Sequence, residues 1–256
     1  MKKVALLTLV SMAVPAVFAK DTILVNRVGP SASELYVANG DGSGERKLFP
    51  VTGFDYDASF SADGKWIVFT SERKLSADIY RVRTDGTGLE QLTNNSGFND
   101  APALSPDGQQ VAFMSTRDSG NTNIWILDIK TRKLRNLTNT SAPIGNFRPS
   151  WSPDGKWIVF SSDRNIQADR NVIFDHAKGR WEHLLAASLY VIQPDGKGLR
   201  RLTPAGKFAG SPKWSLDGKQ VVFYELAVED TLAARGFGNP ASQIVSIDVA
   251  TGARKE

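Results

Sequence analysis

The two histidines of this chain lie close together, in a stretch of side chains that can bind metals or move protons. His176 follows Asp175, and His183 follows Glu182. Imidazole and carboxylate groups are common metal ligands and acid–base catalysts. The His-x6-His spacing matches no standard metal motif, however, and histidines on exposed loops are usually solvated or hydrogen-bonded to the backbone. We therefore expect a binding or structural role for this segment and no bound metal.

Three arginines recur at one point of a repeated pattern, just after an apolar stretch. Two interpretations stay open for Arg73, Arg117 and Arg164. They ring a channel mouth for an anionic ligand, or, as the favoured alternative, each pairs with a carboxylate and joins neighbouring repeats; the candidate carboxylates are Asp57, Asp78, Asp100 and Asp118. The full set of candidate binding residues is Arg73, Arg117, Arg164, His176, Arg180, Trp181, His183, Glu229 and Arg235.

Standard catalytic motifs are missing from the sequence. It contains no Gly-x-Ser-x-Gly nucleophile elbow, no His-Glu-x-x-His and no P-loop. The absence of cysteine excludes disulfides, thiolate metal sites and a cysteine nucleophile. These observations favour a non-catalytic protein without a cofactor.

Four near-copies of one turn reveal the scaffold that must position these residues. They are Ser61-Ala-Asp-Gly64, Ser105-Pro-Asp-Gly108, Ser152-Pro-Asp-Gly155 and Ser215-Leu-Asp-Gly218. Each is followed by an apolar run, and Asp-Gly between such runs is typical of a tight β-hairpin. The turns are 44, 47 and 63 residues apart (61 to 105, 105 to 152, 152 to 215). Periods in the forties with several strands per repeat indicate a β-propeller.

A third and a fourth strand complete each repeat. Every third strand precedes a leucine of the fourth by 13 residues (35 to 48, 79 to 92, 124 to 137, 189 to 202). The predicted fold is an all-β propeller of about five four-stranded blades. We expect the first blade to lack its innermost strand and the last its outermost, since Ile244 plus 13 exceeds the 256 residues. The expected domain, residues 20–256, would then be truncated at its C-terminus and belong to a ring of six or more blades.

Two segments carry a family resemblance. Pro102–Phe113 and Pro149–Phe160, with the arginines and Leu-Thr pairs that follow, resemble the WD40-like PD40 repeat of the TolB β-propeller family. The resemblance covers essentially residues 21–256 and implies the fold. It does not extend to the α/β domain that precedes the propeller in that family, so recognition of that family's lipoprotein partner is not carried over. One fold hosts many activities, so the resemblance is less specific for function.

The first 19 residues have the pattern of a secretory signal peptide. Lys2-Lys3 precede the apolar run 4–18, which is too short to span a bilayer as a helix. Removing both lysines lowers the formal charge from +4 to +2, and the remaining charges are scattered. We therefore expect no nucleic-acid partner, no transmembrane segment and a monomer in the periplasm, with secretion as the alternative.

Loops of unequal length indicate the face that binds. The insertions at 163–188 and 226–242 follow the second strand of adjacent repeats, so we expect them to meet on one face and form the main concave surface. A second candidate is the channel mouth near Asp57, Asp100 and Arg148. The leading hypothesis is a binding scaffold for a protein, peptide or glycan. The alternatives are the propeller of a larger exported hydrolase (a prolyl-oligopeptidase-type peptidase or an amidohydrolase) and a metal-dependent propeller lyase using His176 and His183.

Overall fold

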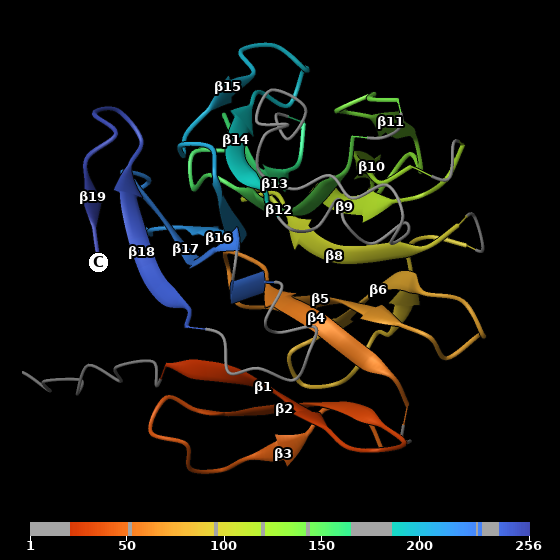
Figure 1. Cartoon of the computed structure of the whole chain (residues 1–256). Helices are drawn as coiled ribbons and strands as arrows, with labels where there is room; N and C mark the ends of the chain where they lie inside the picture. Colours follow the sequence, from red (N-terminus) through yellow and green to blue (C-terminus); the bar gives the residue numbers. More distant parts are fainter. Residues whose placement is uncertain are drawn as a thin grey trace, which may run out of the picture.

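Five antiparallel sheets follow one another around a common axis (Figure 1). The computed structural model describes residues 21–50, 53–94, 97–118, 121–141, 144–164, 186–228, 230–231 and 241–256. In these residues the first sheet has three strands and each of the others has four. The predicted all-β propeller of five blades is therefore confirmed.

Each sheet is one blade, and its strands are adjacent in sequence order. Blade 1 contains β1 (Thr22–Val28), β2 (Ser33–Asn39) and β3 (Arg46–Lys47). Blade 2 contains β4 (Asp55–Phe60), β5 (Trp66–Ser71), β6 (Asp78–Arg83) and β7 (Glu90–Gln91). Blade 3 contains β8 (Asn99–Leu104), β9 (Gln110–Ser115), β10 (Asn123–Asp128) and β11 (Leu134–Asn136). Blade 4 contains β12 (Asn146–Trp151), β13 (Ile158–Ser162), β14 (Ser188–Ile192) and β15 (Arg200–Arg201). Blade 5 contains β16 (Lys207–Trp214), β17 (Gln220–Ala227), β18 (Gln243–Asp248) and β19 (Arg254–Lys255).

The repeated Ser-x-Asp-Gly turn joins the first two strands of blades 2 to 5. In blade 2 the Ser61 hydroxyl donates to Asp63 (2.6 Å) and accepts from the Trp66 backbone N–H (2.9 Å). Gly64 has a φ of 68°, the left-handed conformation that glycine adopts most easily. The same serine–aspartate hydrogen bond recurs in the other three turns. The predicted hairpins are confirmed.

The apolar core lies in the seams between blades. One buried cluster joins each successive pair, from blades 1 and 2 to blades 4 and 5. The second strand of each four-stranded blade places a phenylalanine in these seams, and all four side chains are essentially inaccessible; they are Phe69, Phe113, Phe160 and Phe223. The blades therefore stabilise one another face to face, as repeat architectures require.

The strand predictions for blades 1 and 5 have different outcomes. Within the described residues blade 1 consists of three strands and has no innermost one, as predicted. The prediction that blade 5 lacks its outermost strand is wrong, because β19 pairs with β18 through Ser246 opposite Lys255 and Ile247 opposite Arg254. The outermost strands of blades 1, 2 and 4 also have only two residues, so this short ladder forms before the position of the expected leucine.

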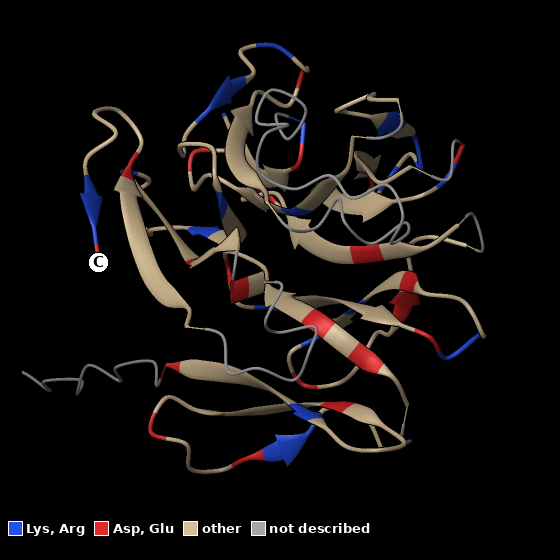
Figure 2. Cartoon of the chain, viewed as in Figure 1, with Lys and Arg blue, Asp and Glu red and all other residues tan. Residues whose placement is uncertain are grey.

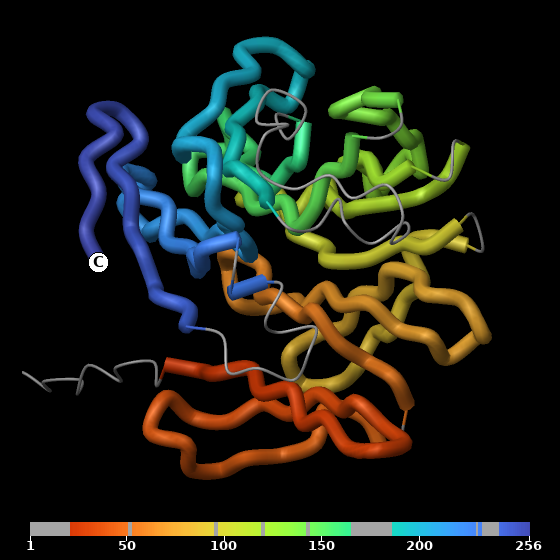
Figure 3. The backbone as a smooth tube through the Cα atoms, in the orientation of Figure 1, coloured from red at the N-terminus to blue at the C-terminus, as the bar shows by residue number. Residues whose placement is uncertain are grey.

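Blades 1 and 5 flank the open side of the ring (Figure 3). Within the described ranges, no packing comparable to the four seams joins the strands of blade 5 to those of blade 1. Val159 and Leu189 of blade 4 are fully buried against blade 5, whereas their repeat equivalents Val222 and Ile244 are 37% and 67% exposed. Membership of a larger ring stays a prediction, as do the signal peptide and the domain limits.

Candidate functional site

The innermost strands of blades 2 to 5 meet at the axis and share an unusual backbone feature. Each contains a bulge, and at each bulge a residue other than glycine has a positive φ. These residues are Asp57 (48°), Ala101 (51°), Arg148 (50°) and Ser211 (49°). The left-handed conformation costs most residues about 1–2 kcal/mol, and backbone strain of this kind is concentrated at functional sites. The axis is therefore the first place to seek a site.

Neighbouring inner strands are fixed to one another by tryptophan side chains. The Trp151 indole N–H donates to the Ala103 carbonyl oxygen of blade 3 (3.2 Å). The Trp214 indole N–H donates to the Ser150 carbonyl oxygen of blade 4 (3.2 Å). Because the strands are held in this way, side chains at the bulges project from a rigid frame.

A cavity of about 140 Å³ opens between the bulges. All four inner strands contribute to its walls. Its lining residues are Asp57, Ala58, Ala101, Pro102, Arg148, Pro149, Ser211, Pro212 and Lys213. A space of this size holds several water molecules or the end of a partner's side chain.

The charges around the cavity are divided between two sides. Blade 2 contributes the acid Asp57, and Asp100 of blade 3 lies near enough to act on Asp57 and Arg148; the acidic positions of their strands β4 and β8 are red in Figure 2. Blades 4 and 5 contribute the cations Arg148 and Lys213. One ion pair crosses the axis, from Arg148 Nη1 to Asp57 Oδ1 (3.0 Å). The fold thus joins residues that are 91 positions apart in the sequence.

Asp100 is a buried carboxyl beside this ion pair. Its Oδ1 accepts hydrogen bonds from the Thr70 hydroxyl (2.8 Å) and from the Ala101 backbone N–H (2.6 Å). Burial and the nearby Asp57 charge raise the pKa of Asp100 to about 6, and these hydrogen bonds oppose the rise only in part. Its negative charge is therefore poorly compensated by the protein.

Lys213 is a cation of the same cavity that has no partner among the described residues. Its side chain reaches solvent through the cavity, and no described residue lies within hydrogen-bonding distance of its ammonium group. Surrounding protein lowers the pKa of Lys213, and the Arg148 charge adds to this effect while Asp57 opposes it. The repeat pattern contained a signal for this residue: Ser59, Ala103 and Ser150 occupy the equivalent positions, so Lys213 alone is charged.

The three repeated arginines form hydrogen bonds within their own blades, and Arg73 also lies over the Phe49 ring of blade 1 (4.9 Å). Arg73 donates to both carboxylate oxygens of Asp55 (2.9 and 3.1 Å), and Arg117 donates to Asn99 Oδ1 (2.7 Å). Arg164 makes the same contact with Asn146 (2.8 Å). Each also donates to a serine at the end of the second strand and lies over two aromatic rings of its own blade.

This arrangement fits the pairing interpretation, with partners that the sequence did not indicate. In the hydrogen bonds between described residues the acceptors are one aspartate and two asparagines at the start of the innermost strand, while Asp118 and Asp78 act on Arg117 through their charges alone. Asn99 continues the network by donating to Asp78 of blade 2 (3.0 Å), so the network also joins two blades. A ligand-binding role of the arginines stays a prediction.

The other predicted binding residues lie outside the described residues. They are His176, Arg180, Trp181, His183, Glu229 and Arg235. The insertions at 163–188 and 226–242 also lie mostly outside the described residues, so the expectation that they meet on one face stays a prediction. Within the described ranges no group of three or more His, Cys, Asp or Glu side chains is placed to hold a metal. No helix in the same ranges is long and apolar enough to cross a bilayer.

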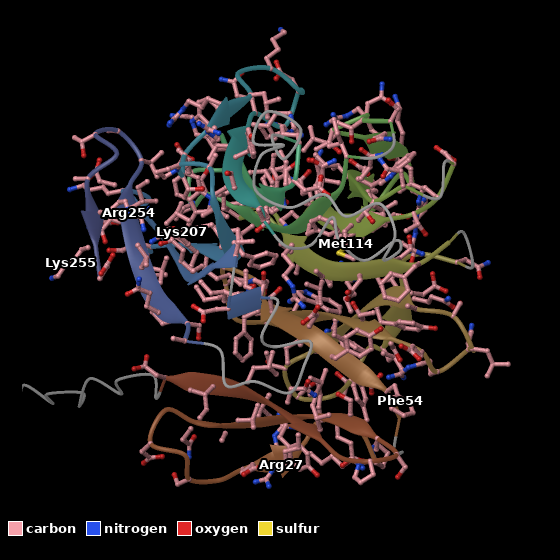
Figure 4. The ribbon with its side chains drawn as sticks, in the orientation of Figure 1. Arg27, Phe54, Met114, Lys207, Arg254 and Lys255 are labelled. Carbon is pink, nitrogen blue, oxygen red and sulfur yellow. The ribbon has the colours of Figure 1, made fainter. Side chains whose placement is uncertain are left out.

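A cluster of charged side chains joins three strands of blade 5. The buried Glu225 carboxylate accepts from Lys207 Nζ (2.8 Å) and from Arg254 Nη2 (2.6 Å); Figure 4 labels both cations on blade 5. Burial raises the pKa of Glu225, but the two hydrogen bonds and charges together outweigh this and hold it below the ordinary value. The cluster therefore explains why β19 is fixed to the blade.

Asp163 gives the folded protein a pH-dependent stability. Its Oδ1 accepts from the Gly145 backbone N–H (2.6 Å), and burial raises the pKa of Asp163 to about 7. The same carboxyl ionises near pH 4 in an unfolded chain. Between about pH 4 and 7 the folded protein therefore retains a proton that the unfolded chain has lost, and stability falls as pH rises.

We expect Asp163→Asn to remove this loss. The amide oxygen can still accept from Gly145, so on going from pH 4.5 to pH 8 the variant should gain on the order of 2 kcal/mol relative to the parent. Urea unfolding at both pH values measures the difference. The stability of the variant should still fall somewhat as pH rises, because the pKa of Asp100 is raised as well. Identical pH profiles for parent and variant would contradict the assignment.

Comparison with known proteins agrees with this architecture. The family model of the TolB beta propeller domain matches residues 86–174. The crystal structure of TolB from Acinetobacter baumannii is similar over 93% of this chain and 52% of that chain, with 23% identity and a TM-score of 0.69. A putative TolB from Agrobacterium tumefaciens is similar over 77% of this chain and 67% of that chain, with 25% identity and a TM-score of 0.59.

A curated relative matches a shorter stretch. The uncharacterized peptidase YuxL of Bacillus subtilis (strain 168) is 30% identical over 106 residues, which are 41% of this chain and 13% of that protein. The chain thus spans about half of the Acinetobacter TolB and a small part of the peptidase.

The fold and the axial cavity define the class of protein: a repeat β-propeller with a charged cavity between its inner strands. Residues 86–174 match the TolB beta propeller domain, and the two TolB structures share the propeller fold of this chain.

Proposed function

We propose that this protein is an exported, non-catalytic β-propeller that binds a protein, peptide or glycan partner in the cell envelope. The observation that carries the proposal is the axial cavity, where three charged side chains, from blades 2, 4 and 5, converge on strained backbone. Rigid scaffolds that display a few polar groups in a concave site are typical of binding proteins. Export to the periplasm rests on the signal-peptide pattern of residues 1–19.

A partner at the axis would contact several blades at once. The cavity is too small to enclose a whole ligand, so its walls suit one projecting group of a larger partner. The candidate residues of the insertions at 163–188 and 226–242 stay a further proposed part of the binding surface. Fixed inner strands mean that little conformational entropy is lost on binding.

A phage-displayed dodecapeptide library and a glycan array provide probes for the full chain. We expect selected binders to lose at least about tenfold in affinity, or 1.4 kcal/mol, for Arg148→Met. The matched control is Lys133→Met, an exposed cation on a loop of blade 3, which should bind as the parent does. Circular dichroism confirms that both variants fold. Binders that tolerate Arg148→Met fully would overturn the axial assignment.

One observation favours a second candidate, the propeller of a larger exported hydrolase. The matched stretch is only 13% of the Bacillus subtilis peptidase, so in that protein the similar segment belongs to a much longer chain. The DNA that follows codon 256 tests this candidate. A hydrolase domain in the same reading frame would favour it over a free-standing scaffold, and a stop codon would exclude it.

A further inference from the structure

We propose that the basic side of the axial cavity binds a carboxylate of the partner, held by the Lys213 ammonium group together with the Arg148 guanidinium. This inference rests on the proposed function and names the chemical group that the site recognises. It starts from a cation that projects into the cavity and has no hydrogen-bonding partner among the described residues.

The two cations have unused hydrogen-bond donors. Among described residues, the only hydrogen bond from the Arg148 guanidinium is the one from Nη1 to Asp57. In the described part of the chain no acceptor lies within hydrogen-bonding distance of the Lys213 ammonium group, and Arg148 lies near enough for its charge to act on Lys213. An anion between them would accept hydrogen bonds from both and relieve their repulsion.

The acids of the cavity limit the charge that the site accepts. Among the described residues, Asp57 forms its ion pair with Arg148, whereas Lys213 forms none. Asp100 lies near enough for its charge to act on Arg148 and Asp57, and it would repel a second negative charge. A singly charged carboxylate therefore fits better than a doubly charged phosphate.

The repeat pattern does not require a lysine at position 213. The equivalent positions of the other blades are the small residues Ser59, Ala103 and Ser150, on strands with the same bulge. Departures from a repeat's own pattern are expected where function sets the residue. A carboxylate could come from a chain terminus or from an Asp or Glu side chain, and both sources present the same group.

Three small probes distinguish these sources in NMR titrations of the full chain. N-acetylglycine carries a terminal carboxylate, the α-amide of N-acetylglutamic acid carries a side-chain carboxylate, and N-acetylglycinamide carries neither. The readout is the Lys213 ¹³Cε resonance, assigned by its loss in Lys213→Arg. We expect saturable shifts with the carboxylates, the tighter one identifying the source, and none with the amide.

In variants without the Lys213 resonance, backbone amide shifts measure the binding of the same probes. For the carboxylates we expect at least tenfold weaker binding to Lys213→Met, binding within about threefold of the parent for Lys213→Arg, and severalfold tighter binding to Asp100→Asn. Equal binding of the amide, no saturable shift with either carboxylate, or unchanged binding to Lys213→Met would overturn the inference.

Failure of this inference can be told apart from failure of the proposed function. If library-selected binders depend on Arg148 while neither carboxylate probe binds, the axial site stands and its carboxylate chemistry is wrong. If the carboxylates bind at Lys213 while selected binders ignore the axis, the anion site stands and the partner surface lies elsewhere.

Discussion

Replacing Phe160 by alanine should lower the free energy of unfolding by about 3–5 kcal/mol. The Phe160 side chain is fully buried in the seam between blades 3 and 4. Its ring stacks on Tyr190 with centroids 6.1 Å apart, and the Arg164 guanidinium lies 5.4 Å from its centroid. Alanine leaves a cavity between two sheets that cannot collapse without moving a blade. Urea unfolding followed by tryptophan fluorescence measures the loss.

Phe54→Ala is the matched control, because the Phe54 side chain is 45% exposed at the edge of blade 2 (Figure 4). We expect a change within about 0.5 kcal/mol there. A loss below about 1 kcal/mol for Phe160→Ala would mean that the seam between these blades is not a close-packed core.

Arg73→Met should destabilise the protein by about 3–5 kcal/mol. The Asp55 side chain, 4% exposed, would lose the cation that holds both of its oxygens and remain as an unpaired buried charge. Burying a charge without a partner is among the costliest single changes. The unfolding free energy in urea at pH 7 measures the effect.

The chain supplies the control for this substitution. Asp55→Asn converts the pair of blade 2 into the asparagine–arginine pair that blades 3 and 4 already contain. We expect it to cost less than about 1 kcal/mol, and in an Arg73→Met background it should recover part of the loss because no charge stays buried. If Asp55→Asn alone is as harmful as Arg73→Met, the pairs of different blades are not equivalent.

The hairpin turns and strand order could be predicted because they depend on local chemistry. Ser61, Asp63 and Gly64 form a turn whose hydrogen bonds join residues only a few positions apart, and the same turn recurs in three more blades. The missing innermost strand of blade 1 was predicted from the fixed spacing between strands. The error at β19 arose because a two-residue strand needs no leucine, and Arg254 is fixed instead by Glu225.

The axial site was only partly predictable, because its geometry depends on distant segments. Asp57, Asp100 and Arg148 were named as a second candidate surface, and the structure brings Asp57 and Arg148 into contact. Lys213 was missed, since its significance emerges only when the repeats are aligned position by position. The positive φ of Ala101 has no local signal of the kind that glycine gives.

A crystal structure of the full chain with its tightest library-selected ligand would test the central claim most directly. We predict that the ligand inserts a group between Arg148 and Lys213 and covers the bulges at Asp57 and Ala101. A ligand seated wholly on another surface, with the axial cavity left unchanged, would contradict it.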